Sequence, residues 1–282
     1  MPTFMRRMLK WLLILPLCAA GLLMLLVSGC QSKLIYYPRS YASGTVAQWQ
    51  QATRGVCVDY STSDGPQRSY LQGNLKTPRH LWIVCCGNGS TAMDWAAWFA
   101  TQPVPDDAYL LFDYPGYGAC NGKPGIAGIE ESLTAVVPAA WRQLGWSGEV
   151  DGRRLRFFGH SLGAAAALIV ARQHGIRKGV LMSPFTRMRD MADLRLGLPL
   201  GFLITQRYDN LAGMADLQKR GDARVVILHG ARDESIPVAM GRQLKASHPD
   251  IVELVEIPQG HHNNLLLEAP QQILTAMRDV AK

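Results

Sequence analysis

Apolar and polar residues alternate along this chain in two different ways, and the change between them falls near Leu81. Before it, residues 56–60 and 70–75 alternate on either side of the turn signal Ser63-Asp64-Gly65-Pro66, a pattern typical of an antiparallel hairpin. After it, short apolar runs are separated by longer stretches with a helical period. This second pattern predicts parallel strands joined by crossover helices.

The apolar runs locate the expected strands, and the stretches between them locate the expected helices. After the hairpin we predict strands at 81–86, 108–113, 154–158, 178–182, 224–229 and 251–257. We predict helices at 91–101, 127–144, 162–174, 237–247 and 265–280. The expected fold is therefore α/β, with a mostly parallel eight-stranded sheet and helices on both of its faces.

One segment, residues 185–222, interrupts this alternation. Its apolar stretch Gly197–Phe202 is too irregular for a regular strand or helix, so we expect a small cap beside the functional site. The chain contains no internal repeat, low-complexity tract or linker. We predict one domain over residues 51–282, preceded by an anchor and lead-in segment at 30–50.

Residues 1–29 have the composition of a targeting segment. Three cations among the first ten residues precede Trp11–Val27, 17 residues that are uncharged and almost wholly apolar. The segment ends in Val27-Ser28-Gly29-Cys30, which resembles the bacterial lipoprotein signal, in which Cys30 would be lipidated and begin the mature chain. An uncleaved membrane anchor is the alternative, because 17 apolar residues lie at the lower limit for spanning a bilayer.

The lipoprotein resemblance places the protein in the bacterial cell envelope, held on the periplasmic face by lipid. Gln31 follows the cysteine, where lipoproteins kept in the inner membrane more often have Asp, so the resemblance favours the outer membrane. Without the three cations of the signal, the formal net charge of +7 falls to +4. No Lys/Arg run is interleaved with aromatic residues, so we expect a membrane surface as a partner and no nucleic acid.

Six cysteines occur, of which Cys18 would leave with the signal and Cys30 would be acylated. The other four are Cys57, Cys85, Cys86 and Cys120. An oxidising periplasm permits disulfides. Cys86 and Cys120 are expected on loops near the same rim and are the pair that we predict. Reduced, buried cysteines that pack as small apolar residues are the alternative.

The strongest chemical signal is Gly159-His160-Ser161-Leu162-Gly163. The predicted strand at 154–158 leads into it, and the alanines at 164–167 follow it, which is the strand, turn and helix context of a nucleophile elbow. The turn holds the serine in a strained conformation that side chains at Gly159 or Gly163 would obstruct. We therefore predict Ser161 as a nucleophile, with a plain strand-to-helix turn as the alternative.

A serine hydroxyl needs a base within hydrogen-bond reach, and the base needs an acceptor that orients it. Asp233 lies on a loop after the apolar run 225–228 and is the predicted acid. The alternatives to it are Glu234, Asp190, Asp193 and Asp209. After the last predicted strand, His261 and His262 occupy a loop where the base is expected, so the chain order is Ser, Asp, His.

Together these features resemble the α/β-hydrolase branch that includes bacterial serine-aminopeptidase-like hydrolases and eukaryotic depalmitoylating thioesterases, over residues 34–280. Members commonly read Gly-x-His-Asn at the histidine loop, and Gly260-His261-His262-Asn263 matches this, so the resemblance assigns the base to His262. His229 also matches a family position and is interpreted as structural. The remaining histidines interpreted as surface or packing residues are His80, His174 and His248.

The negative charge of a tetrahedral intermediate requires preorganised hydrogen-bond donors. We expect one to be the backbone N–H of Leu162 and the other to come from the loop at 85–90, with Asn88 the best candidate. Family members usually have His before this Gly-Asn pair, where this chain has Cys86. That change removes the hydrogen bonds that usually support this loop. An oxyanion hole built from backbone amides can form without them.

The sequence thus predicts a serine hydrolase that cleaves carboxylic esters or thioesters through an acyl-enzyme, without a metal or an organic cofactor. The apolar stretch near 197–204 and the anchor favour a small-molecule or lipid-like acyl substrate. Tyr114 and Tyr117 are interpreted as packing residues, with a place in the acyl or leaving-group pocket as the alternative. Peptide or amide cleavage by the same residues is the second hypothesis, and a non-catalytic envelope lipoprotein is the third. An intact Ser, Asp and His argues against the third.

Overall fold

The computed structural model describes residues 11, 12, 14, 31–102, 104, 106–146 and 152–282. Most of the predicted signal segment, together with Cys30, lies outside the described residues. Within the described ranges, no helix has both the length and the apolar character needed to cross a bilayer.

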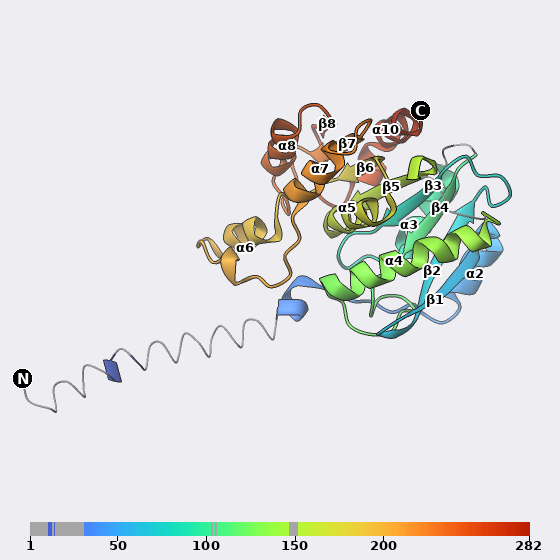
Figure 1. Ribbon diagram of the computed structural model, residues 1–282, viewed down its shortest axis with the longest axis horizontal. Coiled ribbons are helices and arrows are strands. Elements are labelled where there is room, and N and C mark those ends of the chain that lie inside the picture. Colours follow the sequence, from blue (N-terminus) through green and yellow to red (C-terminus); the bar gives the residue numbers. More distant parts are fainter. Residues whose placement is uncertain (1–10, 13, 15–30, 103, 105, 147–151) are drawn as a thin grey trace, which may run out of the picture.

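A single eight-stranded sheet organises the chain, with the order β1-β2-β4-β3-β5-β6-β7-β8 (Figure 1). β1 pairs antiparallel with β2, and β2 antiparallel with β4, whereas all other pairs are parallel. The predicted α/β fold is therefore confirmed. The strands are β1 (Val56–Thr62), β2 (Gly65–Gly73), β3 (Leu81–Cys85), β4 (Ala108–Phe112), β5 (Leu155–His160), β6 (Lys178–Met182), β7 (Arg224–Gly230) and β8 (Val252–Ile257).

Helices cover both faces of the sheet and create a core on each. In β3, Leu81 and Ile83 face the core under α4, α5, α7 and α8, whereas Trp82 and Val84 face the core under α2, α3, α9 and α10. Successive side chains of a strand point to opposite faces, so burial on both sides explains the continuous apolar runs. The helices are α2 (Thr45–Thr53), α3 (Ala92–Thr101), α4 (Ile126–Gln143), α5 (Leu162–His174), α6 (Met188–Leu196), α7 (Asn210–Gln218), α8 (Val238–Ser247), α9 (Leu265–Glu268) and α10 (Pro270–Ala281).

Three segments differ from the helices expected. α2 forms at Thr45–Thr53, where no helix was predicted, and it crosses the boundary expected at residue 51, because Trp49 packs into the core. The helix predicted over 265–280 is divided into α9 and α10, because Pro270 begins a new helix and cannot continue the hydrogen bonding of the previous one. Residues 185–222 contain α6, a short 3₁₀ turn at Gly201–Leu203 and α7. α6 stands away from the sheet at the end of the molecule where the described body begins with Gln31 (Figure 1).

The predicted disulfide between Cys86 and Cys120 is wrong, because all four described cysteines are free. The side chain of Cys86 is buried in the core on the α3 side of the sheet. Cys120 instead packs against β2, where its Sγ lies 3.2 Å from the carbonyl oxygen of Arg68. Nearness of two loops does not align two side chains, and a disulfide requires both.

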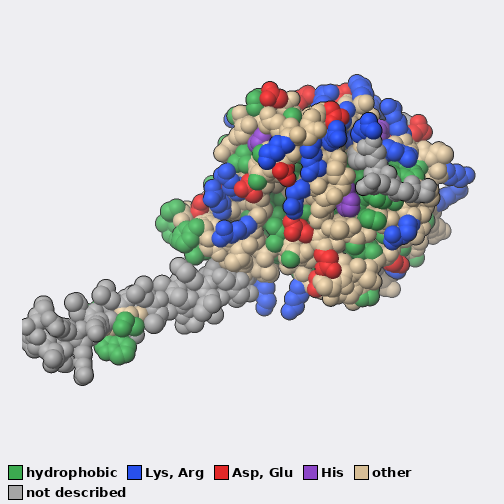
Figure 2. Space-filling view, in the orientation of Figure 1, with side chains coloured by type: hydrophobic (Ala, Val, Ile, Leu, Met, Phe, Trp, Pro, Cys, Tyr) green, Lys and Arg blue, Asp and Glu red, His purple; other side chains and the backbone are tan. Residues whose placement is uncertain are grey.

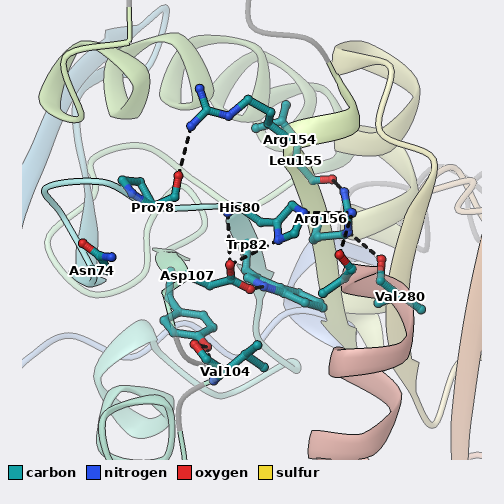
Figure 3. A network of polar contacts seen from close by, with 12 residues as sticks. Asn74, Pro78, His80, Trp82, Val104, Asp107, Arg154, Leu155, Arg156 and Val280 are labelled. Carbon is teal, nitrogen blue, oxygen red and sulfur yellow. Dashed lines mark hydrogen bonds and ion pairs between the residues drawn. The ribbon is translucent and has the colours of Figure 1, made fainter.

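A buried polar network closes the edge of the sheet where the parallel strands begin (Figure 3). Asp107 accepts a hydrogen bond of 2.8 Å from Trp82 Nε1 and lies 3.2 Å from Nδ1 of His80. Nε2 of His80 lies 3.1 Å from the guanidinium of Arg156, which also donates to the carbonyl of Val280 at 2.6 Å. The network joins the starts of β3 and β5 to the end of α10, and it gives His80 the packing role that the sequence predicts.

Candidate active site

Ser161 occupies a sharp turn between β5 and α5, with φ 56° and ψ −118°. Few residues other than glycine adopt such a backbone conformation, so the surrounding structure must hold it. A Cβ at Gly159 would lie 2.3 Å from the carbonyl oxygen of Gly163, and a Cβ at Gly163 would lie 2.0 Å from that of Cys85. Both glycines are therefore required by sterics, as expected for a nucleophile elbow.

The structure brings together the three residues that the sequence predicts for catalysis. Nε2 of His262 lies 3.0 Å from Oγ of Ser161, and Nδ1 of His262 lies 2.8 Å from Oδ2 of Asp233. Asp233 and His262 are both buried. Because an ionised carboxylate only accepts hydrogen bonds, Nδ1 carries the proton and Nε2 is left to accept from the serine hydroxyl.

Asp233 sits in a loop that supplies it with donors. Its Oδ1 accepts from the backbone N–H groups of Ser235 at 2.9 Å and Ile236 at 2.7 Å. Burial alone would raise the pKa of Asp233, but the hydrogen bonds from His262 and from the Ile236 N–H outweigh burial and lower that pKa to about 2. The carboxylate is therefore ionised at neutral pH.

Ser183 is a neighbour of this acid that sequence reasoning missed. Its buried hydroxyl helps to lower the pKa of Asp233, although its Oγ makes no hydrogen bond of regular geometry within the described residues. Its backbone is at φ 45°, and its N–H donates to the carbonyl of Leu228 at 2.9 Å. Its place directly after β6, between the strands that carry Ser161 and Asp233, is the signal that could have found it.

The other candidates for base and acid face elsewhere. The ring of His261 is half exposed, and its Nδ1 lies 3.1 Å from Oε2 of Glu234. Its backbone N–H donates to Oδ1 of Asn264. The three remaining carboxylates bind other groups, namely the Thr186 hydroxyl for Asp190, the Gly201 N–H for Asp193 and the Ala212 N–H for Asp209.

His160, the residue before Ser161, supports the histidine loop through a buried hydrogen bond. Its Nε2 donates to the backbone carbonyl of His262 at 2.9 Å, and the centroids of the two rings lie 4.9 Å apart. Burial lowers the pKa of His160 to about 3, so its ring is neutral. Nδ1 faces Gly87, where a Cβ would lie only 2.6 Å away. His160 thus packs the loop at 85–90, the turn at Ser161 and the histidine loop against one another.

The side chain of Asn88 is engaged in holding the lead-in segment. Its Oδ1 accepts from the N–H of Tyr37 at 3.1 Å and from the hydroxyl of Tyr117 at 2.8 Å, and its Nδ2 donates to the carbonyl of Ile35. Only its backbone N–H is therefore available for the predicted role. Leu162 is the first residue of α5, so its N–H belongs to the first-turn donors that have no partner within the helix.

The two tyrosines of the neighbouring loop and His229 have packing roles. Tyr114 and Tyr117 are fully buried, and Tyr114 donates to the carbonyl of Cys86 at 2.5 Å. Nε2 of His229 donates to the carbonyl of Ile236 at 2.8 Å and lies 3.6 Å from Asp233. His229 therefore supports the acid loop from inside.

Comparison with known proteins agrees with this architecture. A family model described as "Alpha/beta hydrolase family" matches residues 82–217. An uncharacterized protein of Mycobacterium tuberculosis is 30% identical over 275 residues, which cover 96% of this chain and 94% of that protein. The chain belongs to the alpha/beta hydrolase family. The matched region of this alpha/beta hydrolase contains Ser161 and ends before Asp233 and His262.

Further relatives of this alpha/beta hydrolase match over a shorter span or in fold alone. Alpha/beta hydrolase domain-containing protein 17C of Homo sapiens is 28% identical over 158 residues, which cover 56% of this chain and 45% of the human protein. Esterase Pf2001 of Pyrococcus furiosus superposes with a TM-score of 0.66 at 16% identity, covering 87% of this chain and 96% of that one. Esterase RhEst1 of a Rhodococcus species superposes with a TM-score of 0.56 at 14% identity, covering 79% and 97%. At such identities the structural likeness shows the fold.

Proposed function

We propose that this alpha/beta hydrolase cleaves carboxylic ester or thioester bonds through an acyl-enzyme on Ser161. The observation that carries the proposal is the hydrogen-bond chain from Ser161 Oγ through His262 to Asp233, beginning at a serine held in a strained elbow. Such a chain supplies what a serine hydroxyl lacks at neutral pH, namely a base within reach and an acceptor that holds the base in one tautomer.

The proposed reaction has two halves. Ser161 Oγ attacks the acyl carbon as His262 Nε2 takes its proton, and His262 then gives that proton to the leaving alcohol or thiol. Water, deprotonated by the same nitrogen, attacks the acyl carbon of the acyl-enzyme, and His262 returns that proton to Ser161 Oγ as the C–Oγ bond breaks and the acid is released. The ionised Asp233 stabilises the imidazolium formed in each half. The backbone N–H groups of Leu162 and Asn88 are the proposed donors to the oxyanion.

Hydrolysis of p-nitrophenyl esters with acyl chains of two to sixteen carbons tests this function. Ser161→Ala and His262→Ala should each lower kcat by about 10⁴-fold or more, since loss of either residue disables the unit. His261→Ala is the matched control and should stay within about threefold of the parent, because its ring bonds to Glu234 at the surface.

Three results would count against the proposal. Equal losses in His261→Ala and His262→Ala would contradict the assigned base. Folded protein that neither turns over any ester nor labels with a fluorophosphonate at Ser161 would favour a non-catalytic protein, whereas labelling with turnover of peptides alone would favour a peptidase.

We also propose that Cys30 carries lipid and holds the enzyme in the bacterial envelope, with the outer membrane favoured. The apolar segment Trp11–Val27 and the small residues before Cys30 support this. The proposed substrate class is a small or lipid-like acyl compound, because a lipid-anchored enzyme works beside a concentrated source of acyl chains.

A further inference from the structure

The cap carries a group of apolar side chains that nothing in the described chain covers. None of the nine residues of α6 is buried. The cap tip, as we call it, consists of Leu194, Leu196, Leu198 and Phe202, whose exposed fractions are 49%, 57%, 58% and 63%. Figure 2 shows hydrophobic side chains gathered at this protruding end of the molecule. Clusters of large exposed apolar residues usually mark a surface that contacts a protein or a membrane.

The cap tip lies at the place where the predicted anchor meets the domain. Gln31 donates from Nε2 to the carbonyl of Leu203 and accepts from the N–H of Thr205, both at 2.7 Å. Gln31 directly follows Cys30, so the proposed lipid attachment is one residue from a side chain that is bound to the cap. Leu34, in the helical residues 31–35, is 67% exposed.

The same segment also borders the candidate active site. Arg195, at the end of α6, donates to the carbonyl of Ser235, two residues from Asp233. On the other side, the lead-in residue Tyr37 binds Asn88 in the loop beside the elbow. The cap tip therefore projects from the part of the rim that lies between the anchor and the acid loop.

The carboxylates of the cap do not oppose contact with an apolar phase. Asp190 accepts from the hydroxyl of Thr186 at 2.6 Å, and Asp193 accepts from the N–H of Gly201 at 2.5 Å. Asp209 caps α7 and pairs with Arg187. Each of these three carboxylates thus has a partner within the cap, and the large apolar side chains exposed at its end are leucine and phenylalanine. Long arginine side chains beside an apolar surface can reach the polar headgroups of a membrane.

We propose that the cap tip inserts into the bilayer that holds the anchor, so that the rim of the active site faces the membrane. This inference rests on the membrane attachment proposed above, and it names the surface through which a lipid-borne acyl ester reaches Ser161. A shallow insertion of a few large apolar side chains beside an anchor is how many peripheral proteins orient on a membrane.

A fluorescent probe tests this directly. Full-length protein is reconstituted into phosphatidylethanolamine–phosphatidylglycerol vesicles and labelled with NBD at Phe202→Cys. The matched control is Ser247→Cys, exposed at the end of α8 on the opposite edge of the sheet, and the unsubstituted chain corrects for labelling of native cysteines. Doxyl-labelled lipid should quench the probe at 202 and spare the probe at 247, whereas iodide in the buffer should do the reverse.

Each other outcome overturns the inference in its own way. Failure of the full chain to float with vesicles removes the membrane attachment and the docking surface together. Flotation with a probe at 202 that iodide quenches as readily as the control overturns the docking surface alone. A probe shielded from both quenchers shows that a second copy of the chain covers the cap tip. None of these readouts depends on hydrolysis, so they are separate from the test of Ser161.

Activity supplies a second measurement. Leu198→Asp/Phe202→Asp should lower hydrolysis of a long-chain ester carried in vesicles by about tenfold or more, since each residue loses the transfer energy of an apolar side chain. The control Ser247→Asp should retain the parent rate. Equal rates for the two variants, both with the melting temperature of the parent, would contradict the docking surface.

Discussion

His261 and His262 are adjacent in the chain but lie in different environments. His262 is buried against Asp233 and Ser161, whereas His261 meets Glu234 at the surface. What separates them is the path of the loop, which His160 fixes by donating to the carbonyl of His262. At the scale of the residue, the geometry of the proposed base therefore depends on a histidine with no chemical step of its own.

His160→Phe tests this positioning role. The ring is kept but its hydrogen bond to His262 is lost, so kcat should fall by about tenfold, which corresponds to one hydrogen bond, with little change in KM. His174→Phe is the matched control, because His174 also contacts a backbone carbonyl, that of Leu133, away from the site. The measurement is ester kinetics for both variants. An unchanged kcat in His160→Phe would show that His160 does not position His262.

The burial of His160 also leads us to expect that the stability of the fold depends on pH. Its pKa falls from 6.5 to about 3 on folding, so between these values the unfolded chain binds a proton that the folded chain does not. Its contribution to stability is therefore complete above about pH 6.5 and is lost as the pH falls toward 3.

Urea unfolding between pH 4 and 7.5 measures this linkage. In the parent, the free energy of unfolding should fall on acidification by up to about 1.4 kcal/mol per pH unit from this group. In His160→Phe the free energy of unfolding should fall less steeply with pH, by an amount that corresponds to at most one proton, whatever the absolute stability of the variant. Identical slopes in the two proteins would show that His160 does not titrate in this way.

At the scale of elements, the loop between β3 and α3 joins the lead-in segment to the elbow. The amide of Asn88 contacts Ile35, Tyr37 and Tyr117, and the backbone carbonyls of Cys85 and Cys86 pack against Gly163. The side chain of Asn88 thus holds the lead-in segment, while the backbone of the loop packs against the turn at Ser161.

Asn88→Ala distinguishes these two uses. The backbone N–H remains, so we expect kcat to fall by less than about tenfold while the melting temperature drops with the loss of the rim contacts. A side chain that itself stabilised the oxyanion would instead cost about 100- to 1000-fold in kcat. Asn74→Ala, in an exposed turn after β2, controls for the loss of an asparagine. Kinetics and thermal melts of both variants should be compared.

At the scale of the whole molecule, the two edges of the sheet have separate tasks. The edge where the parallel strands begin is closed by Asp107, His80 and Arg156, which hold the C-terminal helix. The opposite end of the sheet, where the parallel strands terminate, carries Ser161, the cap and the lead-in segment. The buried polar network and the candidate active site therefore lie at opposite ends of the parallel strands.

Cys30→Ala tests the attachment of the whole molecule to a membrane. The variant should lose metabolic labelling by a palmitate analogue and run as the uncleaved chain, because lipidation precedes cleavage at such a signal. Cys57→Ala is the control and should keep the label, since Cys57 lies within β1 of the folded domain. Labelling that persists in Cys30→Ala would contradict the lipid anchor.

The sequence by itself determined the order along the chain of the strands and of the helices that join the parallel strands, and the location of the glycine-flanked turn at Ser161, whereas α2, α6 and α7 were not predicted. Both depend on local properties: the period of apolar residues follows from burial on one or two faces, and Gly159 and Gly163 follow from sterics within a few residues. The chain order of serine, acid and histidine could be read in the same way.

Only the tertiary structure decided which side chains meet. Ser161 and His262 are 101 positions apart, and the hydrogen bond between them depends on two loops converging at one edge of the sheet. Cys86 and Cys120 share a rim yet point to different surroundings, and the amide of Asn88 turns toward the lead-in segment. In these loops, side-chain direction is set by packing against elements distant in sequence, which the local pattern does not show.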